Sequence, residues 1–564
     1  MWHDELVLYL SMGPVAGQTR FPLPNLSSIV WLSLLAAMFL RGPGDLDYGW
    51  QIRTGEHILA SGRIGHPDTF SYTIAGKELP DHEWLYEVLL ALVWKGFGDG
   101  GLNFARVCLY IIPVLILERQ LRRRGVPDYS AAWFVLLAGF MLFWFERLRP
   151  LVCTTICLQL VSGWLYDQCR GRRPLDWKLP LTMLLWGNLH PAVIMGQFLL
   201  AGAIIWEWVC YMCGWGHADE RFPRHPKATI GKLTIWGLVG LSASMICPAP
   251  INRFTYPFAA ELRHPIQRRF VEIMPTWQFL WHEHGLRTFI AWLVVVLAVI
   301  FTFLMLRKYW QFRVWEWALY VCLLGLAFTA ARAIGDWLLI ALALIVPRFG
   351  PWMRQDAWVR RHNSGFRLLV RLDQLAKVLG RQPLHRPQRH WSVVGLSVLF
   401  FVALAVPARY LPNRDYADAP KGVVDWLDSL YRPSDGPLKI FSGSNEGAYL
   451  IWRLDGGAKV YTDTRGFFYP GPLLEDSFYL PREEAELNDR LERVLAYGTD
   501  LFLLPVDDAD GDEFRFWQSL KPYCSAPLYS DDPNQRGPHF VLLTADQVTE
   551  AVKKRSADPS AKRR

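Results

Sequence analysis

The stretch of residues 102–124, LNFARVCLYIIPVLILERQLRRR, decides the fold class. Its first part, about residues 102–117, is an apolar run of the kind that forms a membrane-spanning helix. The run leads into a cluster of arginines, Arg119, Arg122, Arg123 and Arg124. Because links rich in Lys and Arg stay on the cytoplasmic side of a membrane, this cluster predicts a helix that starts outside and ends inside.

The composition of the whole chain agrees with a membrane protein. Hydrophobic residues make up 52% of the 564 residues, charged residues make up 20%, and 27 residues are Trp. This is more apolar and more aromatic than a typical soluble chain. The net charge of +8 comes from Lys and Arg gathered in particular links, which indicates orientation in a membrane. We therefore expect membrane lipids as partners and no nucleic acid.

Ten further apolar runs can be assigned to membrane spans, and the basic links between them all fall on the same side of the membrane. The runs are residues 26–40, 131–145, 151–166, 179–189, 192–211, 233–246, 289–306, 315–330, 337–346 and 391–406. Basic links at residues 170–173, 221–232, 307–308 and 348–389 all fall on the inner side. The sequence thus predicts a polytopic α-helical membrane protein of about eleven transmembrane helices over residues 26–408, with residues 1–25 in the cytoplasm and the first loop, residues 41–100, outside.

The chain after residue 409 has the character of a separate outer domain. Short apolar stretches at residues 438–441, 448–452, 459–461, 501–505 and 540–543 are typical of strands. Helical periodicity at residues 420–430 and 483–497 lies between them. We predict an extracytoplasmic α/β domain over residues 409–548, followed by a basic, disordered tail at residues 549–564.

The first outer loop holds the densest polar chemistry in the chain. Asp45 and Asp47 follow the first span directly, which places two carboxylates at the membrane surface, where lipid-borne substrates keep their head groups. Residues 50–59 form an amphipathic segment suited to lying on the interface, and Asp68, His82 and Glu83 come next. A structural role is the alternative to a functional one. The acids can simply be solvated residues that flank the span, and His82 and Glu83 can cap the helix that follows.

Several of these segments carry a resemblance. The run DYGWQIRTG at residues 47–55, GRI at 62–64, PDTFSYT at 67–73 and HEWL at 82–85 resemble bacterial multi-spanning proteins related to the family C glycosyltransferases (GT-C), including Rgt-like and dolichyl-phosphate-mannose mannosyltransferase-like proteins. Further similar segments are LRP at 148–150, WGNLH at 186–190, GAYLIW at 447–452 and YTDTR at 461–465. The chain differs from that pattern at Gly49 and Gln51, where Trp and His are common.

The resemblance implies a bacterial inner or plasma membrane enzyme that moves a hexosyl or pentosyl group, with inversion, from a polyprenyl-phosphate carrier to an extracytoplasmic glycan, lipid or protein. It implies a loop carboxylate as general base, matched by Asp47 with Asp45 as the second candidate. The reaction itself needs a base for the acceptor hydroxyl and cationic partners for the departing phosphate. Candidate substrate-binding residues are Arg147, Arg149, His190, Arg332, His82, Glu83, Asp68, Asp463 and Arg465.

For the candidate arginines, and for Asp463 and Arg465, a structural role is the alternative to substrate binding. The arginines can also snorkel to the interface or pair with Asp336 or Glu146. Asp463 and Arg465 follow a strand-like run, a common position for binding groups, but they can equally pair with each other to hold a turn.

The metal requirement and the class of protein also leave alternatives. Asp45 and Asp47 have a spacing that accompanies a divalent cation in some related proteins; we expect no obligatory cofactor or metal, with a divalent cation as the alternative. A non-catalytic scaffold or degenerate relative is the main functional alternative. A transporter is disfavoured because the charges lie at span edges and no internal repeat is evident.

Overall fold

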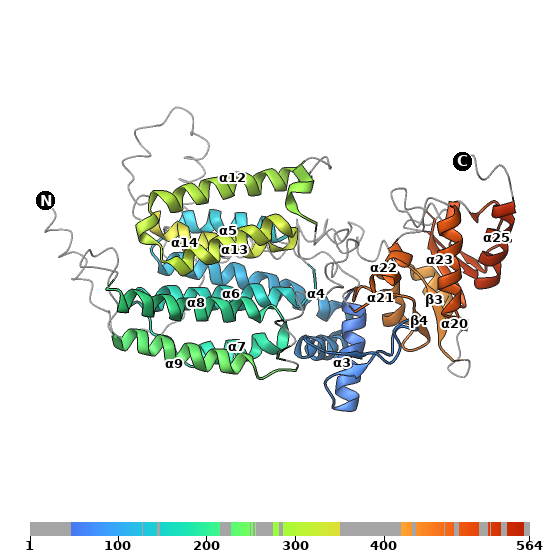
Figure 1. Cartoon of the computed structure of the whole chain (residues 1–564), viewed down its shortest axis with the longest axis horizontal. Helices are drawn as coiled ribbons and strands as arrows, with labels where there is room; N and C mark the ends of the chain where they lie inside the picture. Colours follow the sequence, from blue (N-terminus) through green and yellow to red (C-terminus); the bar gives the residue numbers. More distant parts are fainter. Residues whose placement is uncertain are drawn as a thin grey trace, which may run out of the picture.

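The computed structural model describes residues 47–126, 128–143, 147–214, 227–248, 250–251, 254, 274–280, 286–349, 419–430, 436–466, 468–478, 484–506, 517–518, 520–531 and 539–557. Asp45, the first and last predicted spans and the predicted cytoplasmic residues 1–25 lie outside these residues. A bundle of helices forms one part of the molecule and the C-terminal region forms another, with the first loop between them (Figure 1).

The bundle is built from helices that follow nine of the predicted spans. They are α4 (Trp84–Arg123), α5 (Asp128–Phe143), α6 (Leu151–Gln168), α7 (Lys178–Leu189), α8 (Val193–Met212), α9 (Lys227–Ser244), α12 (Leu286–Arg307), α13 (Val314–Thr329) and α14 (Ile334–Ile345). Among the described residues, Trp84–Arg123, Val193–Met212 and Thr288–Arg307 are long and apolar enough to cross a membrane. Helix α4 extends the predicted span by reaching back into the first loop, and it is kinked at Gly98, whose φ of 57° suits glycine.

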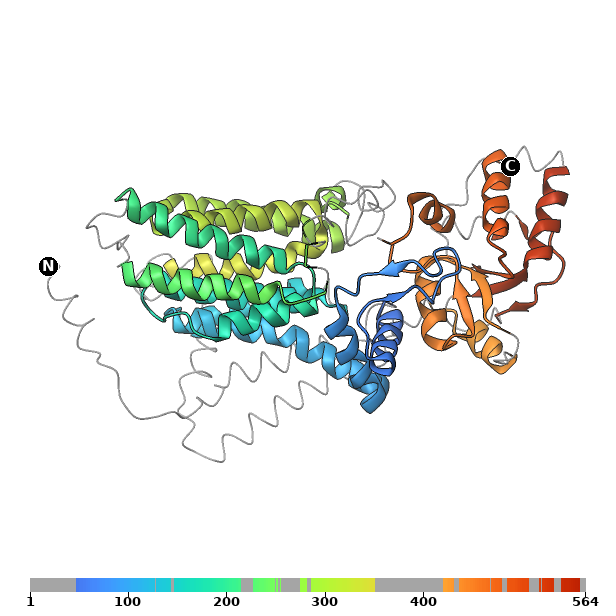
Figure 2. The same ribbon diagram turned by 60° about the horizontal axis from the view of Figure 1, so that its bottom comes forward.

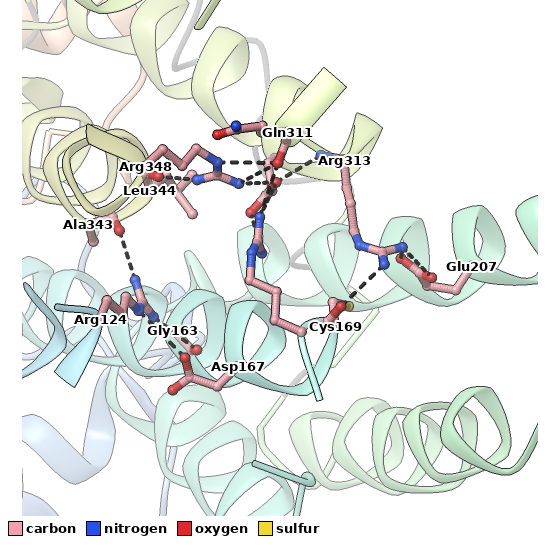
Figure 3. A network of polar contacts seen from close by, with 12 residues as sticks. Arg124, Gly163, Asp167, Cys169, Glu207, Gln311, Arg313, Ala343, Leu344 and Arg348 are labelled. Carbon is pink, nitrogen blue, oxygen red and sulfur yellow. Dashed lines mark hydrogen bonds and ion pairs between the residues drawn. The ribbon is translucent and has the colours of Figure 1, made fainter. Parts of the chain in front are cut away.

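One end of the bundle is tied by a buried ion network (Figure 3). Glu316 at the start of α13 binds Arg170 at 3.1 Å and Arg348 at 2.7 Å, which joins the ends of α6 and α14. Arg313 binds Glu207 of α8 at 2.5 Å. Each carboxylate faces an arginine at close range, as buried charges require. Arg170 and Arg348, from two of the basic links that were predicted to be cytoplasmic, therefore meet at a single end of the bundle.

The C-terminal region contains a mixed five-stranded sheet of order β4-β3-β5-β7-β6. Its strands are β3 (Leu438–Phe441), β4 (Ala458–Val460), β5 (Leu501–Pro505), β6 (Tyr529–Ser530) and β7 (Phe540–Thr544). Strands β3 and β4 are parallel to each other, and β5 is parallel to β3, whereas β7 is antiparallel to both β5 and β6. Helices α20 (Lys421–Leu430), α22 (Gly471–Phe478) and α23 (Glu484–Ala496) also belong to this region.

Two predictions for this region are wrong in detail. Residues 448–452 were expected as a strand, but they lie in helix α21 (Ser444–Arg453), which connects β3 to β4. A parallel strand pair needs such a crossover, and a short apolar run cannot by itself distinguish a buried helix from a strand. The basic tail was expected to be disordered from residue 549, but helix α25 (Ala545–Ala557) covers it as far as residue 557, with Val548, Ala551 and Val552 buried.

Helix α3 (Tyr48–Ser61), which contains the predicted amphipathic segment at residues 50–59, packs against α4 of the bundle and against α21 of the C-terminal region. Two glycines permit the close approach. A Cβ atom on Gly55 would lie 2.2 Å from the carbonyl oxygen of Glu87 in α4, and one on Gly49 would lie 2.7 Å from Cβ of Trp452 in α21. Gly49, where the sequence departs from the family pattern, is thus explained by packing against α21.

The first loop also joins the sheet of the C-terminal region. The strands β1 (His66–Pro67) and β2 (Glu78–Leu79) form a hairpin, and Ser71, in the segment that connects them, pairs in parallel with Val460 of β4. The Val460 N–H donates to the Phe70 carbonyl at 3.0 Å, and the Tyr72 N–H donates to the Val460 carbonyl at 3.2 Å. The loop therefore covers the β4 edge of the sheet, between the bundle and the domain (Figure 2).

Gly49→Ala is expected to destabilise the contact between α3 and α21. The new methyl group must displace the Trp452 side chain or the helix backbone, and overpacking of this kind costs about 1–3 kcal/mol. Thermal unfolding of the purified protein would show this as a lower Tm. Gly96→Ala in α4 is the matched control, since its added Cβ meets nothing within 4 Å; an equal loss in both variants would contradict the packing argument.

Candidate functional site

The candidate site lies where several helices start or end beneath the C-terminal region. Asp47 precedes α3, Glu83 precedes α4, and Arg149 lies just before α6. His190 follows the last residue of α7, and Arg332 lies in the short turn η5 (Ala331–Ala333) before α14. Because consecutive helices of the bundle alternate in direction, these positions meet at the end opposite the buried arginine network.

Asp47 and Arg149 form the closest ion pair of this cluster. Nη2 of Arg149 lies 2.6 Å from Oδ2 of Asp47, the distance of a charge-assisted hydrogen bond. The Asp47 side chain is 9% exposed and that of Arg149 is 25% exposed. The predicted base and the predicted phosphate ligand are thus in direct contact, with the arginine on the more open side.

Glu83 supplies a second carboxylate beside this pair. Its Oε1 lies 3.4 Å from Nε2 of His190, and the Gln51 amide hydrogen-bonds its carboxyl group. Burial and the neighbouring charge of Asp47 raise the pKa of Glu83 to about 8, although Arg149 and Arg332 act in the opposite direction.

A chain of hydrogen bonds orients His190. Nε1 of Trp186 donates to Oγ1 of Thr154 at 2.9 Å, and that hydroxyl lies 2.8 Å from Nδ1 of His190. The backbone N–H of Ala192 also donates to Nδ1, at 3.2 Å. A nitrogen that accepts from an N–H carries no proton in the neutral ring, so Nε2 is the protonated nitrogen and points at Glu83.

The segments HEWL and WGNLH, far apart in the sequence, interlock at this site. Besides the contact of Glu83 with His190, Nε1 of Trp84 donates to Oδ1 of Asn188 at 2.8 Å. The Asn188 amide nitrogen donates to the carbonyls of Leu184 and Ile246, both at 2.8 Å. The start of α4 is therefore fixed to the end of α7 by both members of the Glu-Trp pair.

The remaining predicted residues near the site have different surroundings. Arg332 is exposed and close enough to Glu83 and Asp336 to interact with both electrostatically. The backbone of Arg147 is fixed by the hydroxyl of Tyr110 at 2.9 Å. His82 is buried, and its backbone N–H donates to the carbonyl of Pro80.

Asp68, Asp463 and Arg465 come together away from this cluster, in a closed ion network. Nη1 of Arg465 lies 2.8 Å from Asp68, and Nη2 lies 2.6 Å from Asp463, which also accepts from the Tyr469 hydroxyl at 2.7 Å. All three charged residues are at most 2% exposed. The pairing of Asp463 with Arg465 is confirmed, and the network joins the first loop to the C-terminal region. A contact of these residues with substrate finds no support in this geometry.

Sequence reasoning missed the supporting residues Gln51 and Thr154. Thr154 is a fully buried hydroxyl inside an apolar helix, and a polar residue in such a place needs a partner, which is the signal that could have identified it. Gln51 appeared only as a departure from the family pattern, whereas the structure shows it 2% exposed and bonded to Glu83.

No group of three or more His, Cys, Asp or Glu side chains is placed to hold a metal ion within the described part of the chain. Asp45 lies outside that part, so the Asp45 and Asp47 pair stays a prediction. A small hollow lined by Trp164, Arg173 and Leu179 lies at the arginine-rich end of the bundle and does not belong to the candidate site.

Comparison with known proteins gives a likeness of fold. No protein-family model and no curated protein matches the sequence. A solved structure of archaeal oligosaccharyltransferase AglB from Archaeoglobus fulgidus, in complex with an inhibitory peptide and a dolichol-phosphate, matches with a TM-score of 0.51 and 10% identity, over 86% of this chain and 69% of that one. The apo oligosaccharyltransferase of the same organism gives a TM-score of 0.49 at 10% identity, over 87% and 70%. The first likeness supports the predicted relationship to the GT-C fold.

Arg465→Met is expected to destabilise the junction of the loop and the domain by about 3–5 kcal/mol, because it leaves Asp68 and Asp463 buried without their cation. Thermal unfolding and limited proteolysis of the loop measure this. Arg453→Met is the control, since its ion pair with Asp425 is exposed and contributes at most about 1 kcal/mol. If Arg465→Met instead weakened acceptor affinity with folding unchanged, the predicted substrate contact would be restored.

Proposed function

We propose that this chain is a membrane glycosyltransferase that transfers a sugar, with inversion, from a polyprenyl-phosphate carrier to an acceptor on the outer side of a bacterial membrane. The observation that carries the proposal is the cluster of two carboxylates, Asp47 and Glu83, with Arg149 and Arg332 at one end of a bundle with the fold of an oligosaccharyltransferase. The dolichol-phosphate and the peptide in that solved structure support a lipid carrier and a protein acceptor for the proposal.

The cluster contains the two kinds of group that the reaction needs. A sugar or side-chain hydroxyl is a weak nucleophile, and a positioned carboxylate strengthens its attack by taking its proton. The departing carrier phosphate gains negative charge, which arginines stabilise through their planar, charged donors. Arg149 and Arg332 both retain exposed surface, so a phosphate at the membrane surface can reach them.

The scaffold alternative explains fewer of these contacts. A scaffold needs the network of Asp68 and Arg465, which is closed and buried. It needs no titratable carboxylate and histidine at a partly exposed edge, because the Trp84–Asn188 hydrogen bond already joins α4 to α7 there. Glu83 and His190 are 19% and 15% exposed in their side chains. Such a costly arrangement of titratable groups is more typical of a functional site than of a structural junction.

Arg149→Met is expected to lower sugar transfer by about 10²–10³-fold, as does the loss of one charge-stabilising donor in other enzymes. Membranes that contain the chain would be given labelled polyprenyl-phosphate sugars, and transfer to endogenous acceptors would be measured. Arg63→Met is the control, because Arg63 is an exposed arginine in the same loop. Equal transfer by the wild type and Arg149→Met would remove Arg149 from the phosphate site.

The proposed orientation is tested by reporter fusions. A reporter that is active only outside the cytoplasm should be active when inserted at Gly76 or after residue 409, and silent after Arg124, because the basic links keep their end of the bundle inside. Gly76 has a φ of 80° and open space around it, so the turn can accept an insertion. Activity after Arg124 would invert the orientation and place the candidate site in the cytoplasm.

A further inference from the structure

The two carboxylates of the site differ in the partners that hold them. Asp47 is bound by Arg149 at 2.6 Å, so its negative charge is already engaged by a cation. Glu83 is bound instead by the uncharged amide of Gln51 and by His190, whose Nε2 lies 3.4 Å away. A carboxylate held by an arginine is a weaker proton acceptor than one held by neutral donors.

Glu83 is also more accessible and is not used by the helix it precedes. Its side chain is 19% exposed, against 9% for Asp47. Although Glu83 occupies the N-cap position of α4, it makes no side-chain capping hydrogen bond. The expectation that it only caps the helix is therefore wrong, and its carboxyl group faces the cluster.

From these contacts we infer that Glu83 is the general base of the proposed transfer, that Gln51 and His190 position it, and that Asp47 anchors Arg149 for the carrier phosphate. This inference rests on the proposed function and replaces Asp47 as the base. The Glu83 carboxylate takes the proton of the acceptor hydroxyl while the oxygen of that hydroxyl forms a bond to the anomeric carbon of the donor sugar. The bond from that carbon to the phosphate oxygen breaks, and its electron pair leaves on the phosphate, beside Arg149 and Arg332.

The surroundings of Glu83 set the expected pH dependence. The charged and titratable groups that face it are Asp47, Glu87, Arg149, Cys153, His190 and Arg332. Burial and Asp47 raise its pKa to about 8. A base must be deprotonated to act, so kcat/KM should rise about tenfold per pH unit below that value and level off above it.

The test compares pH profiles of transfer for four forms of the full-length protein in membranes, with labelled polyprenyl-phosphate sugar as donor. Glu83→Gln should lower the rate of sugar transfer at least 100-fold at every pH, since the amide keeps the shape of the side chain and cannot accept the proton. Asp47→Asn should raise the KM for the donor but keep the rise of kcat/KM with pH, moved to lower pH because the charge of Asp47 no longer raises the pKa of Glu83. Glu78→Gln, which changes an exposed acid in the same loop, should match the wild type.

Gln51→Leu provides a second readout, the position of the pH profile, which does not depend on the loss of maximal activity. The Gln51 hydrogen bond lowers the pKa of Glu83, so its removal should shift the profile toward higher pH, with less activity at pH 7 and an unchanged plateau. Thermal unfolding of each variant confirms that it folds. An unchanged profile in Gln51→Leu would exclude the positioning role of Gln51 and count against Glu83 as the titrating group.

Two outcomes would overturn the inference, and they are distinguishable. If the wild type transfers sugar, Glu83→Gln keeps the pH rise and Asp47→Asn loses it, then Asp47 is the base and the proposed function stands. If the wild type transfers no sugar from any labelled carrier while the protein is folded and inserted, then the proposed function fails and the assignment of Glu83 fails with it.

Discussion

The attachment of the first loop to the C-terminal region is the constraint on which the rest of the structure depends. It combines backbone pairing of residues 70–72 with β4 and the buried contact of Arg465 with Asp68 and Asp463. Breaking a buried ion cluster on one side costs several kcal/mol, so the loop and the domain behave as one unit. Since α3 belongs to the same loop, this attachment also fixes Asp47 at the start of α3 above the end of the bundle.

Much of the bundle could be predicted from the sequence because its signals are local. The apolar runs and the basic links predicted nine described helices and the gathering of arginines at one end, as Arg170 and Arg348 show. The run at residues 448–452 was misassigned because its side chains are buried in a helix between two parallel strands. The topology of the sheet, which local periodicity does not contain, decides that case.

The site was predicted as a set of residues but not as an arrangement. Asp47, Arg149, Glu83 and His190 were each recognised by residue type or by resemblance, and the contacts between them depend on which helix ends meet. Asp68, Asp463 and Arg465 have the same residue chemistry as the site, yet they form a closed junction, because burial decides whether a charge is available to a ligand.

The departures from the family pattern at Gly49 and Gln51 follow from the same packing. A side chain on Gly49 would collide with Trp452 and the backbone of α21, so glycine lets the C-terminal region approach α3 directly. Gln51, two residues further on and on the other side of the same helix, hydrogen-bonds Glu83 without adding a charge beside Arg149. A neutral donor leaves Glu83 with a raised pKa, whereas a cation there would lower it. These two positions thus connect the docking of the domain to the proton affinity of the candidate base.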